Sequence, residues 1–74
     1  MKKWTYFRDR DELRYAGSNN GEVVIIIDLD DIEIYINENG EINEIAIYNA
    51  SKYLDENEIK QIADIALVKK EKHL

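Results

Sequence analysis

Apolar and polar residues alternate twice along the middle of the chain, on either side of Asn37-Glu38-Asn39-Gly40. Strict alternation is the period of a strand with one buried face, and a short polar run ending in glycine is typical of the turn between two paired strands. The pattern therefore predicts a β-hairpin with strands at about 31–37 and 41–48. A type I turn with Gly40 in the left-handed region would place Asn37 opposite Glu41.

The isoleucines of this hairpin predict its register. The apolar phase slips by one residue just after the turn, so one extra residue, Asn43 or Glu44, must bulge out of the second strand. The expected cross-strand partners are then Ile36 with Ile42, Ile34 with Ile45, and Ile32 with Ile47. A two-stranded ribbon with such a face needs a larger sheet and a helix to cover it.

Three further strands are predicted before the hairpin, at about 3–7, 12–16 and 22–28. The last of these contains Val23-Val24-Ile25-Ile26-Ile27, which is apolar on both phases. Such a run is typical of a central strand that is covered on both sides. The segment Gly17-Ser18-Asn19-Asn20-Gly21 is a loop by composition.

After Tyr48 the apolar period changes from two to about 3.6, which predicts a helix over about 55–71. Asp55 and Glu58 have the spacing of a capping box at its start. The apolar stripe of this helix should lie on the isoleucine face of the hairpin; it consists of Ile59, Ile62, Ala63, Ala66 and Leu67. Ile65 and Val68 widen the stripe, and we expect them to contact a second subunit.

These elements predict an α+β fold: an antiparallel β-meander sheet of about five strands with one C-terminal amphipathic helix packed on one face, in a single small domain over 1–74. A domain of 74 residues has barely enough core to be stable alone, so self-association as a homodimer is expected. No segment approaches the length of a membrane span, and cysteine is absent. We therefore expect a soluble cytoplasmic protein without disulfides, thiolate metal sites or cofactors.

The charge is strongly uneven along the chain. The net charge is −6, and residues 15–58 alone carry one basic and eleven acidic side chains. A field of this sign repels phosphate, which disfavours nucleic acid as a partner, and it attracts a basic protein. The composition, rich in isoleucine and free of proline, resembles that of a thermophile or of an AT-rich genome.

Candidate chemistry is sparse. Asp28, Asp30 and Asp31 are the densest carboxylates and could bind a divalent cation, although aspartate is also a favoured turn residue and the turn is the preferred interpretation. No histidine accompanies Ser18 or Ser51, and the only histidine is His73 near the end of the chain. We therefore expect no catalytic site.

Aromatic residues supply the remaining candidates for an interface. Tyr35, Tyr48 and Trp4 could form a patch on the sheet face away from the helix. Tyrosine and tryptophan bury a large area while keeping one polar tip, so they are frequent at protein interfaces. With Ile65 and Val68, these three residues are the predicted interface positions.

Part of the chain resembles a known family. The turn Asn37-Glu38-Asn39-Gly40, the strand end Ile45-Ala46-Ile47 and the segment Asn49-Ala50-Ser51-Lys52 are similar to motifs of the small proteins grouped as domain of unknown function 2283. Tyr6, Asp11 and Leu13 also fit its N-terminal signature, from which Phe7 and Arg14 depart. The resemblance implies an antiparallel meander with a short helical segment, and a prokaryotic protein that binds a partner as antitoxins do. It implies no activity or catalytic residues.

The sequence thus predicts a small acidic, non-enzymatic interaction module that self-associates and engages a basic protein, and the family resemblance implies that this module is antitoxin-like. The alternative is a protein that binds a small ligand or a divalent metal through its acidic turns.

Overall fold

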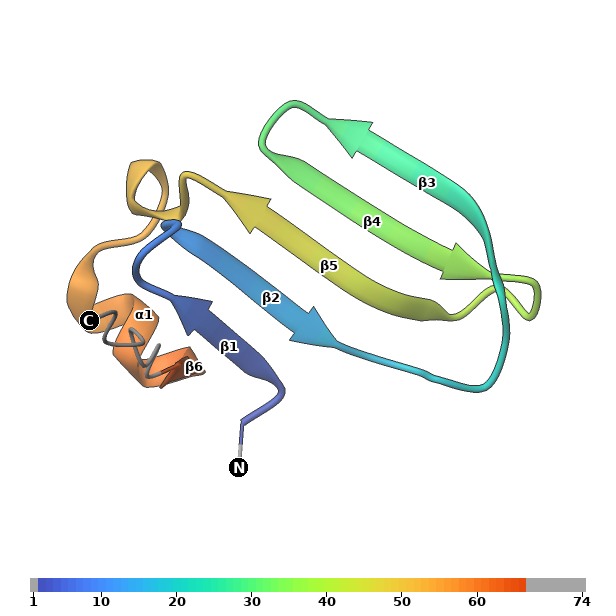
Figure 1. Ribbon diagram of the computed structural model, residues 1–74, viewed down its shortest axis with the longest axis horizontal. Coiled ribbons are helices and arrows are strands. Elements are labelled where there is room, and N and C mark those ends of the chain that lie inside the picture. Colours follow the sequence, from blue (N-terminus) through green and yellow to red (C-terminus); the bar gives the residue numbers. More distant parts are fainter. Residues whose placement is uncertain (1, 67–74) are drawn as a thin grey trace, which may run out of the picture.

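The computed structural model describes residues 2–66. Within this range one open sheet has the strand order β3-β4-β5-β2-β1-β6, and a single short α-helix lies at one side of it (Figure 1). The elements in chain order are β1 (Trp4–Phe7), β2 (Glu12–Ala16), β3 (Val23–Leu29), β4 (Ile32–Asn37), β5 (Ile42–Tyr48), the 3-10 turn η1 (Ala50–Lys52), α1 (Glu56–Ile62) and β6 (Ala63–Ala66). The broad α+β class is confirmed. The pure antiparallel meander of about five strands is wrong, because the sheet has six strands and β6 runs parallel to β1.

The hairpin of β4 and β5 has the predicted register. Its isoleucine pairs are Ile36 with Ile42, Ile34 with Ile45, and Ile32 with Ile47, and the register shifts at Asn43. Gly40 has a φ of 80°, in the left-handed region where glycine has no steric penalty. The Asn37 amide nitrogen donates to the Glu41 carbonyl at 2.8 Å, and its side-chain oxygen accepts from the Asn39 and Glu41 amides. The side chain of Asn37, only 1% exposed, therefore holds the turn from inside.

The chain enters β3 by a crossover rather than by a hairpin. β2 pairs with β5, so β3 joins the sheet on the far side of β4. The connecting loop passes the β4–β5 turn (Figure 1), where the Gly17 amide donates to the Asn43 carbonyl and the Ser18 amide to the Ile42 carbonyl, both at 2.9 Å. A Cβ atom at Gly17 would overlap the Ile42 carbonyl oxygen, so only glycine fits this crossing.

This topology overturns the prediction that residues 22–28 form a covered central strand. β3 lies at the edge of the sheet, with β4 as its only strand neighbour in the described part of the chain. All seven of its residues are exposed. The run of aliphatic residues predicted a strand covered on both faces. Because β2 pairs with β5, the positions between β4 and β1 are occupied, and β3 can pair only at the outer edge of β4.

The predicted helix over 55–71 is also wrong at residues 63–66, which form β6. The Asp55–Glu58 capping box is present and starts α1 as expected. Ala63 is already extended, and β6 pairs with β1, setting Ala63 beside Trp4 and Ile65 beside Tyr6. A helix of two turns gains little from propensity alone, so pairing with β1 prevails, and residues 63–66 also fit a period of two. Positions 67–71 lie outside the described residues.

The core lies between α1 and one end of the sheet. Its buried members are Tyr6, Leu13, Ala50, Ile59 and Ala63, with Trp4, Ile47, Leu54 and Ile65 packed against them. The helix therefore covers β1, β2 and β6, and not the isoleucine face of the hairpin as predicted. Figure 1 shows α1 beside β1 and β6, near the edge of the sheet that is farthest from β3.

Candidate interaction surfaces

Nine aliphatic side chains share one face of β3, β4 and β5, and we call this surface the aliphatic face. Cross-strand pairing places them together, because directly paired residues point to the same side of a sheet. Its members are Ile25, Ile27 and Leu29 on β3, Ile32, Ile34 and Ile36 on β4, and Ile42, Ile45 and Ile47 on β5. None of these nine residues is charged or polar.

The aliphatic face continues the face on which the core is built, but the helix does not reach across it. Ile47, paired with Leu13 of β2, contacts the core and marks the limit of that cover among residues 2–66. On β3, Ile25 is 52% exposed and Leu29 57% exposed. Three strands about 4.8 Å apart and about six residues long give a footprint of roughly 300 Å². Exposed apolar patches of that size often mark binding surfaces.

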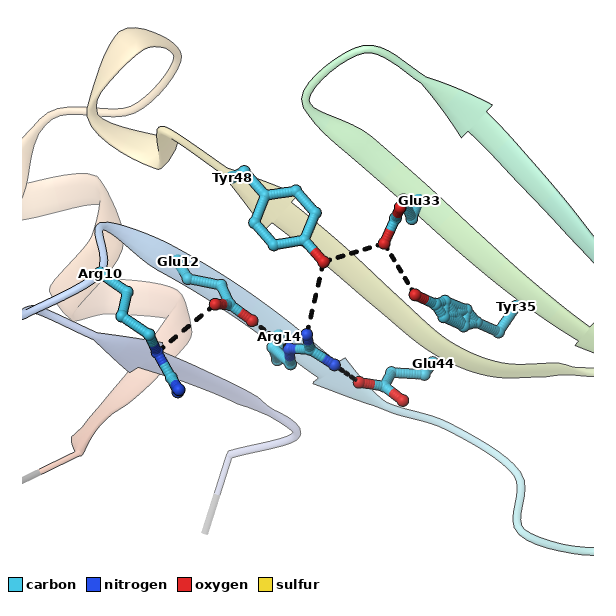
Figure 2. Close-up of polar contacts among 7 residues, drawn as sticks. All are labelled: Arg10, Glu12, Arg14, Glu33, Tyr35, Glu44 and Tyr48. Carbon is cyan, nitrogen blue, oxygen red and sulfur yellow. Dashed lines mark hydrogen bonds and ion pairs between the residues drawn. The ribbon is translucent and has the colours of Figure 1, made fainter.

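The opposite side of the sheet, which we call the polar face, carries a network of charged side chains around Arg14 (Figure 2). The Arg14 guanidinium donates to the carboxylates of Glu12 on its own strand and Glu44 on β5, and it lies 3.5 Å from the Tyr48 hydroxyl. Arg10 approaches the other oxygen of the buried Glu12 at 3.5 Å. The hydrogen bonds that Arg14 donates to Glu12 and Glu44 raise the pKa of Arg14, so this cation stays charged and joins β2 to β5.

Glu33 extends the network onto β4. One of its oxygens accepts from the Tyr35 hydroxyl at 2.7 Å and from the Tyr48 hydroxyl at 2.9 Å (Figure 2). These bonds lower the pKa of Glu33, and they raise the pKa of Tyr35 to about 12. Both tyrosines therefore stay protonated donors at neutral pH, with their hydroxyls turned toward their own sheet.

The predicted interface residues do not form one patch. Tyr35 and Tyr48 share the polar face, but Trp4 lies on the helix-covered side, where its ring is 5.1 Å from that of Tyr15. Grouping Trp4 with the tyrosines was therefore wrong. Ile65 packs on the core from β6, and Val68 lies outside the described residues.

The acidic turn between β3 and β4 is tied to the segment that follows β5. Asp31 accepts hydrogen bonds from the Tyr53 hydroxyl at 2.6 Å, the Lys52 ammonium at 2.9 Å and the Asn49 amide at 3.1 Å. Asp30 has a φ of 57°, which suits the tight turn, and Asp28 is an exposed residue of β3. Among residues 2–66, no three Asp, Glu, His or Cys side chains are grouped so as to hold a metal ion. The geometry is that of a turn anchored by Asp31.

A hollow of about 220 Å³ lies elsewhere, near the ends of β1, β2 and β5. It is lined by Thr5, Phe7, Arg14, Tyr15, Ala16, Asn43 and Glu44. None of these residues belongs to the acidic turns, so the hollow lends no support to a ligand site at Asp28–Asp31. Within the described range, no helix is long and apolar enough to cross a membrane.

Sequence reasoning missed two features of these surfaces. The first is the charged network around Arg14. The alternation of Glu12 and Arg14 with Leu13 and Tyr15 in the sequence could have indicated that Glu12 and Arg14 share a polar face. Their partner Glu44 depends on the pairing of β2 with β5, which no local pattern reveals. The exposed edge of β3 was missed for the same reason.

Comparisons with known proteins identify no relative of this chain. No family model, curated protein or solved structure matches the chain. The resemblance to domain of unknown function 2283 therefore stays a prediction. The residues on which it depends lie in the β4–β5 turn, in β5 and in η1.

Proposed function

We propose that this protein is a small acidic interaction module, without enzymatic activity, that self-associates through the aliphatic face and engages a basic protein partner, as an antitoxin does. The observation that carries the proposal is the uncovered aliphatic face of β3, β4 and β5. The core cluster among residues 2–66 has five buried members, so the nine aliphatic side chains of this face, of which Ile47 also touches the cluster, are a large fraction of the apolar surface. Burying them contributes about 25 cal/mol for each Å² removed from water.

A second copy of the chain is the occupant that fits this face. A protein of net charge −6 repels its own copies, and the acidic residues of the sheet are on the polar face or in the turns. The aliphatic face brings no charge to an interface, so two copies can stack on it without placing carboxylates against each other. Stacked sheets lie about 10 Å apart, and a two-fold axis makes one patch complementary to itself.

The aliphatic face offers nothing ionic for a basic partner to recognise. We therefore assign the basic partner to a different surface of the molecule, and the aliphatic face to self-association alone. The two contacts can be tested separately.

Solution mass tests the self-association with two neighbouring residues of β3. Ile25 is on the aliphatic face, whereas Ile26, 60% exposed, is on the polar face opposite Tyr35. We expect a dimer by light scattering for the native chain and for Ile26→Lys, and a monomer for Ile25→Lys. Burying an unpaired ammonium costs at least about 2 kcal/mol, and a two-fold interface contains it twice.

Circular dichroism of each variant controls for loss of fold, since both positions are exposed. A native chain that is monomeric at high concentration contradicts the proposal. Dissociation by Ile26→Lys but not by Ile25→Lys would show that the subunits associate through another surface.

A further inference from the structure

β3 has the sequence of an interior strand in an edge position. Val23 to Ile27 are five consecutive aliphatic residues, and the strand contains neither lysine nor proline. Edge strands are normally protected from pairing with other chains by lysine, proline, extreme shortness or a covering loop. Apart from a bulge near Val24, the described residues 2–66 show no such protection along β3.

The outer edge of β3 offers backbone groups for pairing. Successive residues of an antiparallel strand direct their N–H and C=O groups alternately toward the partner strand and away from it. β4 occupies one side of β3, so every second residue presents its donor and acceptor outward. An extended segment of another chain can pair with such a row and become a further strand of the sheet.

Acidic residues along β3 indicate the charge of that segment. Glu22 precedes the strand, Asp30 follows it, and Asp28 is directly paired with Glu33 on the polar face. Two carboxylates facing each other across strands repel, and a cation beside Asp28 on the outer side of β3 offsets this repulsion. A second copy of β3 cannot supply that cation. In an antiparallel pair it would bring its own Glu22 toward the Asp28 and Asp30 end of the first copy.

We propose that the free edge of β3 is the docking site for an extended segment of a basic protein, in which lysine or arginine alternates with aliphatic residues. The aliphatic side chains of that segment extend the aliphatic face, and its cations lie beside Asp28 on the polar face. This inference rests on the proposed function in taking the chain to be an interaction module. It uses a different surface from the one assigned to self-association.

A synthetic peptide of alternating lysine and valine is the probe. We expect it to bind the full chain by fluorescence anisotropy and to shift the amide resonances of β3 more than those of β1. The same peptide with alternate backbone nitrogens methylated on its pairing edge should not bind, because it cannot form the ladder. A peptide of alternating glutamate and valine should also fail to bind.

Asp28→Lys reverses the charge at the proposed site and places a lysine opposite Glu33, so the fold should tolerate it. We expect affinity for the lysine peptide to fall about tenfold and the glutamate peptide to begin to bind. Asp9→Lys makes the same change of net charge in the exposed β1–β2 turn, several strands from β3, and should alter the affinity less than about twofold.

If Asp28→Lys and Asp9→Lys lowered the affinity for the lysine peptide equally, the inference would be overturned. It would also be overturned if the methylated peptide bound as tightly as the unmethylated one. In either case, attraction by net charge would be sufficient to explain the binding. Light scattering on the same samples separates the two proposals. A monomeric chain that binds the peptide as described refutes self-association and leaves the β3 site standing. A native dimer that Asp28→Lys dissociates would show that a second copy occupies this edge, which also overturns the inference.

Discussion

At the scale of single residues, Asp31 joins the β3–β4 turn to the segment after β5. Hydrogen bonds from Tyr53, Lys52 and Asn49 lower the pKa of its carboxyl from 3.8 to about 2. A lowered pKa in the folded state means that the ionised form stabilises the fold. That stabilisation is complete above about pH 4 and is lost as the pH falls through about 2.

Asp31→Asn should therefore destabilise the protein most at neutral pH. We expect the difference in unfolding free energy between the native chain and the variant to shrink as the pH falls from about 4 toward 2, measured by urea denaturation. Asp9→Asn, in the exposed β1–β2 turn, is the control and should show a smaller difference at each pH. A difference for Asp31→Asn that does not change with pH would contradict the role assigned to this carboxylate.

Asp31 also shows what single residues reveal in a sequence. Its place in a turn was predictable, because aspartate bonds readily to nearby backbone. Its three donors are 18 to 22 positions further along the chain, so only the folded topology identifies them. The same holds for Arg14 and Glu44, which are 30 positions apart.

At the scale of elements, the crossover from β2 to β3 depends on close contact with the β4–β5 turn. Gly17→Ala should destabilise the fold by about 1–3 kcal/mol, because its methyl group overlaps the Ile42 carbonyl and the backbone must move. Chemical denaturation of the purified variant measures this loss.

Gly40 provides the matched control for this prediction. Its φ of 80° requires a left-handed residue, but a Cβ there meets nothing within 4 Å. Gly40→Asn should therefore cost less than Gly17→Asn, since asparagine tolerates this backbone region but still needs space. Equal costs at the two positions would mean that the crossing is not sterically limited.

The strands of the hairpin were predictable as elements, and the end of α1 was not. The isoleucine phase slip specified the bulge, because a shift of one residue moves a side chain to the other face. Residues 59–66 satisfy both a helical period and, from Ala63, a strand period. Pairing with β1, nearly 60 residues earlier in the chain, decides between them.

At the scale of the whole molecule, the cover provided by α1 divides the sheet into two regions. Tyr6 and Leu13, which pack with Ile59 of α1, are buried, whereas β3 is exposed throughout. In dilute solution we expect amides of β2 and β5 to exchange with solvent more slowly than those of β3, by an order of magnitude or more.

Raising the protein concentration should slow exchange in β3 and β4 while leaving β1 unchanged, because the self-association that we propose would bury the aliphatic face and leave β1 as it is. Hydrogen exchange followed by mass spectrometry or NMR measures both effects. If amides of β3 exchanged as slowly as those of β2 at the lowest protein concentration, the division of the sheet into a covered and an uncovered region would be contradicted.

Strand order was the least predictable property of the whole molecule. The sequence indicates which segments are strands, but the neighbours of each strand are chosen by long-range packing. Here Leu13 pairs with Ile47 and completes the core, so β2 takes the place beside β5 that a meander would have left empty.

The parallel pairing of β1 with β6 also bears on how the protein is made. Ala63, the neighbour of Trp4 in the sheet, is translated almost 60 codons after it. Until then one edge of β1 lacks its strand, and Tyr6 and Leu13 lack Ile59 above them. The nascent chain can close the hairpin of β4 and β5 before residues 59–66 are translated, but β1 must wait for those residues to complete its pairing and its cover.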